Sequence, residues 1–162
     1  MAEFDILVTG GTLPDGRVTD IGITGDRITA LGDLSGSTAG EVIEAAGDLV
    51  SPPFVDPHFH LDATLSYGTP RINASGTLLE GIALWGELKQ TVTVDEMVER
   101  ALAYCDWAVS LGLLTIRSHV DVCDDQLRAV EAMLQVRETV KPYLDLQLVA
   151  FPQDGLYRDP TA

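Results

Sequence analysis

Two histidines, His58 and His60, have the spacing in this sequence that most directly suggests chemistry. Side chains alternate between the two faces of an extended strand, so residues two apart place both imidazoles on one face. Two aligned imidazoles supply half of a site for Zn or Fe. Such a pair can equally be two ordinary polar residues near a strand end, and its spacing alone does not separate these interpretations.

The residues around this pair favour a strand. Phe54 and Val55 form an apolar start that predicts a buried strand, and prolines at 52 and 53 limit where it begins. By the same alternation, Asp62 lies on the face of the two histidines, where it is placed to support them.

A second polar pair, His119 and Asp121, ends another predicted strand over residues 113–121. These two side chains also share a face. In one interpretation His119 lies near the metal or the substrate and Asp121 orients another ligand. In the other they belong to a hydrogen-bonded polar layer without a direct chemical role.

The elements that must position these residues follow from hydrophobic periodicity. Helices are predicted over residues 77–90, 93–111 and from about 124 to just before Pro142, and strands over 113–121 and 144–151. Strand, helix, strand, helix, strand is typical of a parallel sheet in an α/β fold.

Local signals refine these helices. Thr77 with Glu80 and Thr93 with Glu96 each have the spacing of a capping box, and Gly112 is placed to end the second helix. Trp85 is interpreted as a packing residue. The third helix is predicted to bury an apolar face made of Leu127, Val130, Leu134 and Met133.

Residues 1–50 differ from the remainder in holding 9 of the 15 glycines. Short β-rich pieces at 5–8, 20–23 and 27–31 alternate with turn signals, which predicts a small antiparallel sheet. Gly25 and Asp26 are expected to form a tight hairpin. No residues in this part have catalytic spacing.

Composition excludes some partners. The 162 residues carry a net charge of −15, which argues against nucleic acid and against an anionic membrane surface. Cys105 and Cys123 are interpreted as reduced packing residues. Because the sequence shows no basic, apolar leader and no run long enough to span a bilayer, a cytoplasmic location is expected.

Four segments carry a resemblance. Residues 50–62 resemble the first barrel strand of the amidohydrolase superfamily, whose members carry His-x-His there as metal ligands. Residues 75–82, 118–122 and 145–153 are similar to the corresponding segments of bacterial cytosine deaminases. The segments occur in the same order and cover about residues 48 to 155.

The resemblance implies a TIM-type (β/α)8 barrel preceded by a small β-sandwich. Residues 1–50 would be the N-terminal part of the β-sandwich domain, and residues 51–162 the first three β/α units of the barrel. A closed barrel needs eight strands. We therefore expect this chain to be the N-terminal portion of a longer protein, with an incomplete barrel.

The resemblance also implies roles for single residues. His58 and His60 would be metal ligands for Fe or Zn, and Gln153 and the backbone of Leu78 would contact a pyrimidine ring. His119, Asp121 and Asp62 would lie around the metal ligands and support them. The general base and a metal-binding Asp are expected beyond residue 162, so no catalytic residue is assigned among residues 1–162.

The expected activity of the full-length protein is metal-dependent deamination of cytosine or a related nitrogen heterocycle, and we expect a homo-oligomer. One alternative is an amidohydrolase acting on another ring amine or cyclic amide, such as a triazine or creatinine. Arg71, in the loop before the first helix, would suit an anionic substrate if it pointed inward. Another alternative is an inactive piece that needs a complementing chain.

Overall fold

The computed structural model describes residues 2–155, which form two compact units that meet at Pro52 and Pro53. This division lies next to the boundary expected after residue 50. Each unit has its own sheet, and the two are described separately below.

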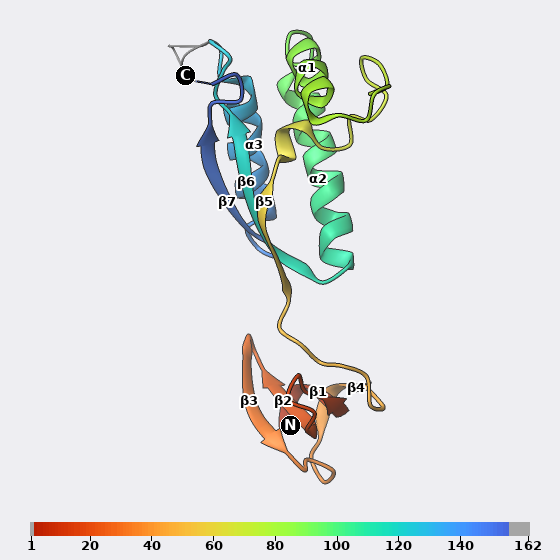
Figure 1. Ribbon diagram of the computed structural model, residues 1–162. Helices are drawn as coiled ribbons and strands as arrows, with labels where there is room; N and C mark the ends of the chain where they lie inside the picture. Colours follow the sequence, from red (N-terminus) through yellow and green to blue (C-terminus); the bar gives the residue numbers. More distant parts are fainter. Residues whose placement is uncertain (1, 156–162) are drawn as a thin grey trace. The chain divides into compact units, whose positions relative to one another are not determined.

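The first unit is a four-stranded sheet (Figure 1). Its strands are β1 (Phe4–Thr12), β2 (Val18–Thr24), β3 (Arg27–Gly32) and β4 (Ala39–Glu44), in the order β3-β2-β1-β4. The hairpin between β2 and β3 is confirmed, with Gly25 at a φ of 60°. Positive φ at the first turn residue is what glycine tolerates without a steric cost.

The antiparallel pairing predicted for the first three strands is confirmed, but a fourth strand that was not predicted, β4, pairs with β1 in parallel. Strand β2 occupies one edge of β1, so β4 pairs with the other edge of β1. The chain crosses to that edge through residues 33–38, and the backbone amides of Glu3 and Phe4 donate to the carbonyl of Thr38. A crossing of this kind brings β4 back in the same direction as β1.

The second unit contains the predicted alternation of strands and helices. Its elements are β5 (Phe54–Phe59), η1 (Leu61–Ala63), α1 (Leu78–Leu88), α2 (Val94–Ser110), β6 (Leu113–Asp121), α3 (Arg128–Val140) and β7 (Asp145–Phe151). The sheet order is β5-β6-β7, and both pairings are parallel. This confirms the α/β class; closure into a barrel and a β-sandwich remain expectations.

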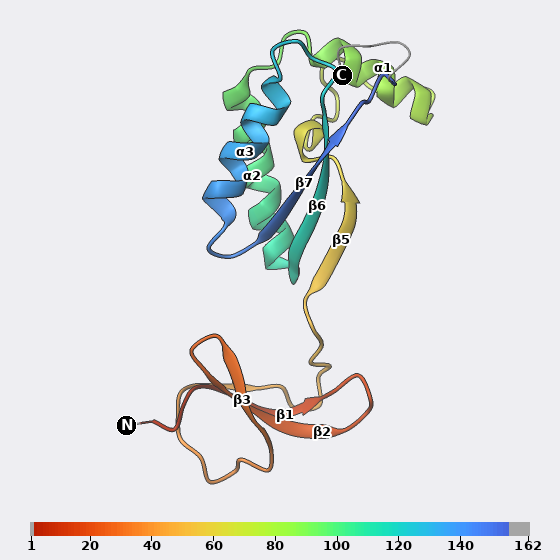
Figure 2. The ribbon, with the colours of Figure 1, turned by 90° about the vertical axis from the view of Figure 1, so that its left-hand side faces the viewer.

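Helices α2 and α3 pack against one side of this sheet (Figure 2). Ile116, Ser118 and Val120 alternate along β6 and are all buried. Phe54 and Val55 are 65% and 60% exposed, so the prediction that they are buried is wrong. They lie at the start of an edge strand, where the described residues leave them accessible to solvent.

The buried face of α3 also differs from the prediction. Leu127 and Leu134 are 45% and 42% exposed. The helix begins at Arg128 because Leu127 has a left-handed backbone, with a φ of 51°. Its buried face has helical spacing and is mostly small: Ala129, Ala132, Met133, Val136 and Val140. Small side chains let α3 approach α2 closely. The prediction placed the larger Leu127 and Leu134 on this face instead.

The helix caps are only partly as predicted. Thr93 and Glu96 form the full capping box at α2, and Gly112 follows that helix with a φ of 82°. At α1, the Thr77 side chain accepts from the amide of Glu80 at 3.3 Å, but the Glu80 carboxylate does not return to Thr77. It accepts from Ser75 instead.

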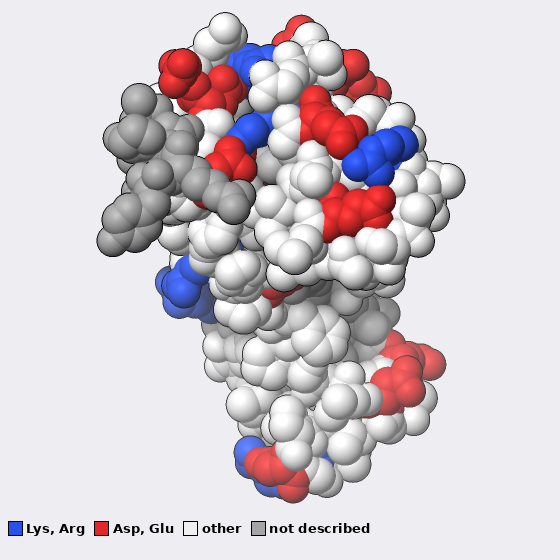
Figure 3. All heavy atoms as spheres, turned by 45° about the horizontal axis from the view of Figure 1, so that its top comes forward, with Lys and Arg blue, Asp and Glu red and all other residues white. Residues whose placement is uncertain are grey.

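Both cysteines are buried and reduced, as predicted. Burial raises the pKa of Cys105 to about 11, so this thiol stays protonated at neutral pH. Within residues 2–155, no helix is long and apolar enough to cross a membrane. The face drawn in Figure 3 carries several separate groups of acidic side chains and no continuous basic surface.

Candidate metal and substrate site

Three histidines gather at one edge of the parallel sheet. Because β5, β6 and β7 are parallel, their carboxyl ends lie at the same edge (Figure 1). The ring centroids of His58 and His60 are 5.4 Å apart, and His119 stacks on His58 at 3.9 Å. His60 and His119 are 6.0 Å apart. His58 at the end of β5, His60 directly after it and His119 near the end of β6 therefore form one cluster at this edge.

The cluster has an aromatic wall. Phe151, the last residue of β7, contacts His60 at a centroid distance of 5.2 Å and His119 at 5.8 Å, edge-on in both cases. Sequence reasoning gave this phenylalanine no role. Its position at the end of the third strand, opposite Asp121 in the register, is the signal that could have found it.

Burial favours the neutral form of two imidazoles in this cluster, those of His60 and His119. Loss of solvent, and next the charge of His58, lower the pKa of His60, while the negative charge of Asp121 opposes this shift. The pKa of His119 is lowered by burial first and by its two histidine neighbours second. A neutral imidazole has a free lone pair, which is the form that binds a metal ion.

The donor set fits part of a metal site. Nδ1 of His119 is buried and has no hydrogen-bond partner of good geometry among residues 2–155. Across the same residues, no three His, Cys, Asp or Glu side chains are arranged as a metal-binding group. The chain thus presents imidazole donors of the type Zn and Fe prefer, while the rest of a coordination shell would have to come from elsewhere.

Asp62 has a different position from the one expected. The strand ends at Phe59, so the alternation that placed Asp62 beside the histidines stops before it reaches this residue. Its carboxylate is buried and accepts from the backbone amides of Asp121 at 2.8 Å and Ala63 at 3.0 Å. Burial raises its pKa to about 6. Asp62 therefore joins the turn after β5 to the end of β6.

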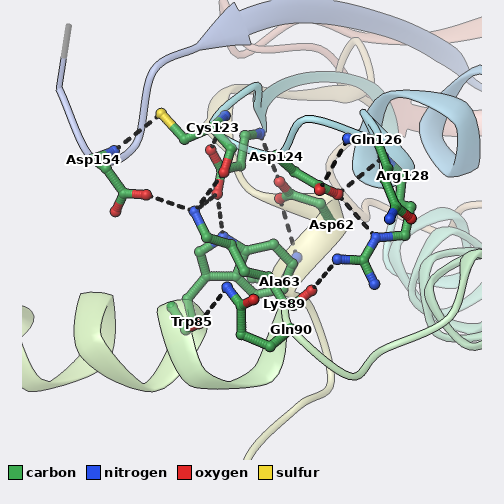
Figure 4. Close-up of polar contacts among 12 residues, drawn as sticks. Asp62, Ala63, Trp85, Lys89, Gln90, Cys123, Asp124, Gln126, Arg128 and Asp154 are labelled. Atoms are coloured by element: carbon green, nitrogen blue, oxygen red, sulfur yellow. Dashed lines mark hydrogen bonds and ion pairs between the residues drawn. The ribbon is translucent and has the colours of Figure 1, made fainter. Parts of the chain in front are cut away.

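Asp121 is part of a second, buried polar cluster, whose members Trp85, Lys89 and Cys123 are labelled in Figure 4. Its Oδ2 accepts from Trp85 Nε1 at 2.6 Å and from Lys89 Nζ at 3.0 Å, and its Oδ1 accepts from the amide of Cys123 at 2.8 Å. Its hydrogen bonds thus lead to α1 and to the loop after β6. The interpretation of Trp85 as a packing residue is confirmed, since it is 9% exposed within the core.

Lys89 is the residue of this cluster that sequence reasoning missed. It is 8% exposed, and its Nζ also donates to the carbonyl of Cys123 at 2.9 Å and to Asp154 at 2.6 Å. Lys89 follows α1 on the side of its apolar residues, and a lysine in such a position indicates a buried partner. Such a residue is rarely fully buried unless it is paired.

The two predicted substrate residues lie on different elements. Gln153 is part-buried in a turn in which the amide of Gly155 donates to the carbonyl of Pro152 at 2.9 Å. Leu78 is the first residue of α1 and is 78% exposed. The contacts described for residues 2–155 join neither of them to the three imidazoles.

Arg71, which would have suited an anionic substrate if it pointed inward, is paired with carboxylates of this chain. Its guanidinium is bound to two glutamates of α1, with 2.8 Å to Glu80 and 2.8 Å to Glu87. Hydrogen bonds from Arg71 also lower the pKa of Glu87. The arginine therefore fixes the loop onto α1.

Comparison with known proteins identifies the family of this chain. The profile of the amidohydrolase family, Amidohydro_3, matches residues 41–159. The N-isopropylammelide isopropyl amidohydrolase of Pseudomonas sp. strain ADP is 34% identical over 163 residues, covering 97% of this chain and 40% of that enzyme.

Solved structures give the same result. The 5-methylcytosine deaminase from Klebsiella pneumoniae, liganded with 5-fluorocytosine, has a TM-score of 0.86 and 36% identity over 95% of this chain and 38% of its own. The N-isopropylammelide isopropylaminohydrolase from Burkholderia multivorans has a TM-score of 0.77 and 30% identity, over 96% and 40%. The chain thus spans about 40% of the length of such relatives. By its match to the family profile over most of its length, the chain belongs to the amidohydrolase family.

Proposed function

We propose that the full-length protein is a metal-dependent aminohydrolase that removes an amine from a nitrogen heterocycle, with cytosine or a closely related pyrimidine as substrate. The observation that carries this proposal is the cluster of His58, His60 and His119 at the carboxyl edge of the parallel sheet. In barrel enzymes this edge is where active sites are built.

The roles of the chain's own residues follow from their positions. His58 and His60 would hold the metal, Fe or Zn, through their ring nitrogens. A divalent ion bound there supplies hydrolytic power by lowering the pKa of water toward about 7. His119 and Phe151 would close one side of the cluster and exclude water from it.

Gln153 is proposed to recognise the ring. A side-chain amide can donate to a ring carbonyl and accept from a ring N–H at the same time, which matches the edge of a pyrimidine. The turn at Pro152 comes directly after β7, so Gln153 lies near the end of the strand that carries Phe151. The backbone of Leu78, at the beginning of α1, is the second proposed contact.

A second candidate is hydrolysis of a different ring amine. It is favoured by the relatives named for N-isopropylammelide, one of which is 34% identical over 97% of this chain. The two candidates share the metal chemistry and differ in the substrate pocket. The identity of the ring is therefore decided by comparing substrates.

The test uses the full-length protein with metal analysis and a panel of cytosine, 5-methylcytosine and N-isopropylammelide. We expect about one divalent ion per subunit and release of ammonia from a pyrimidine. Faster amine release from N-isopropylammelide would favour the second candidate. Bound metal without turnover of any ring would contradict the proposal.

The role of Gln153 has a matched control in the same strand region. Gln153→Ala should raise KM with metal content unchanged. Gln147→Ala removes another glutamine, one whose side chain accepts from Arg117 at 3.0 Å on the exposed sheet face. Equal effects of the two substitutions would count against ring recognition by Gln153.

A further inference from the structure

Lys89 connects the ends of two strands that lie far from it in the sequence. It caps the C-terminus of α1, and its ammonium donates to Asp121 and to the Cys123 carbonyl, which end and follow β6. Its third bond, at 2.6 Å, goes to Asp154 beyond β7. An ammonium has three N–H donors, so all of them are used.

Asp154 is the direct neighbour of Gln153 in the turn after β7. Its carboxylate takes the bond from Lys89, and its amide donates to the Cys123 sulfur at 3.4 Å. The turn is closed by the bond between Gly155 and Pro152. Figure 4 shows both contacts of Asp154, one through its side chain and one through its backbone. Because Gln153 is the preceding residue, these contacts also restrain its backbone.

The same network reaches the segment that carries the paired histidines. Asp121 binds Lys89 through its carboxylate and Asp62 through its amide. Asp62 lies two residues beyond His60. Lys89 is thus connected to the turn of Gln153 and, through two more residues, to the predicted metal segment.

We propose that Lys89 is a positioning residue for substrate binding: by its ion pair with Asp154 it holds the turn of residues 152–155 so that Gln153 can meet the ring. This proposal rests on the proposed function for its kinetic consequence. The structural part, that the Lys89 to Asp154 pair orders the turn, stands independently of which substrate is used.

The kinetic test uses Asp154→Ala in the full-length protein. KM for the preferred ring should rise about tenfold while kcat changes less than about threefold and metal content is unchanged, because positioning affects binding of the ring. Asp154→Glu keeps the carboxylate and should restore part of the affinity. An unchanged KM, or an equal loss in Asp154→Ala and Asp154→Glu, would overturn the proposal.

A neighbouring ion pair supplies the matched control. Asp124 binds Arg128 at 3.0 Å and is part-buried, and Arg128 in turn donates to the carbonyls of Lys89 and Val92, so this pair braces the same region through bonds that do not reach the turn of residues 152–155. Asp124→Asn therefore tests general loosening of this region. It should leave KM unchanged, and a KM increase equal to that of Asp154→Ala would overturn the proposal.

Hydrogen–deuterium exchange separates failure of this proposal from failure of the proposed function. Asp154→Ala should speed amide exchange in the peptide containing residues 150–155 and leave peptides from α3 unchanged. If no ring is turned over by the unsubstituted protein, the proposed function fails, and this measurement still decides whether the turn is anchored. Unchanged exchange in that peptide would overturn the proposal.

Discussion

The two polar clusters at the strand ends differ in how completely their atoms are paired. Around Lys89, the ammonium and the Asp121 carboxylate both have several partners within 3.0 Å. Among the three histidines, Nδ1 of His119 is buried and has no hydrogen-bond partner within residues 2–155, and its ring stacks on that of His58. Buried polar groups are normally satisfied, so an exception needs an explanation.

This difference indicates what each cluster is for. A saturated network of buried charges fixes backbone segments relative to one another and has no donor left for a ligand. A buried imidazole nitrogen without a hydrogen-bond partner, as at His119, is costly to keep and is the kind of atom that binds a metal. Substitutions should therefore affect stability in the first cluster and metal binding in the second.

The largest effect is expected at the histidines. In the full-length protein, His58→Ala and His60→Ala should each abolish metal retention and turnover together, while the fold is kept. Metal analysis and circular dichroism on the same samples check this. Retained metal with near-normal rates in both variants would remove the assignment.

Removing the central charge of the saturated cluster should cost stability. Lys89→Met leaves the buried Asp121 carboxylate without its cation, and losing one partner of a buried pair costs about 3 kcal/mol. Chemical unfolding of the full-length protein measures this. Lys89→Arg keeps the charge and should lose less stability. An unchanged free energy of unfolding in Lys89→Met would show that the network does not stabilise the fold.

A smaller loss is expected from the indole in the same network. Trp85→Phe keeps most of the packing but removes the N–H that donates to Asp121 at 2.6 Å. A hydrogen bond to a charged group contributes about 2 kcal/mol. The free energy of unfolding should therefore fall by less than in Lys89→Met. Because the two residues share Asp121, the double variant should show less than the sum of the two losses.

The sequence predicted the parts of this site that depend on local pattern. The two-residue spacing of His58 and His60 and the parallel direction inferred from alternating strands and helices made a place near the pair one of two interpretations of His119, whose ring does stack on that of His58. Both rules are geometric and hold wherever a parallel sheet forms. The capping box of α2 depends on four consecutive residues and was also predicted.

What the sequence did not predict depends on distant partners. Lys89 meets Asp121 across 32 residues and Asp154 across 65, and no local pattern specifies those neighbours. Leu134 was expected in the core because leucine usually packs there, yet the tight approach of α3 selects alanines. The parallel strand β4 likewise follows from which edge of β1 was free.

The smallest effect should come from an exposed counterpart of the Lys89 cluster. Glu80 has ionic contacts as well, but they lie at the surface, where water screens them. Hydrogen bonds from Ser75, followed by that from Arg71, lower the pKa of Glu80 to about 2, below its ordinary value of 4.5. A carboxyl whose pKa is depressed by folding stabilises the fold above its unfolded pKa, and this contribution is lost as the pH falls through the folded value.

The difference in Tm between the unsubstituted protein and Glu80→Gln should thus be largest above pH 4.5 and shrink as the pH falls toward 2. Glu99→Gln, on the exposed face of α2, is the control for loss of a surface carboxylate. A difference for Glu80→Gln that stays constant over this range would show that the contacts of its carboxylate with Ser75 and Arg71 do not depend on its charge.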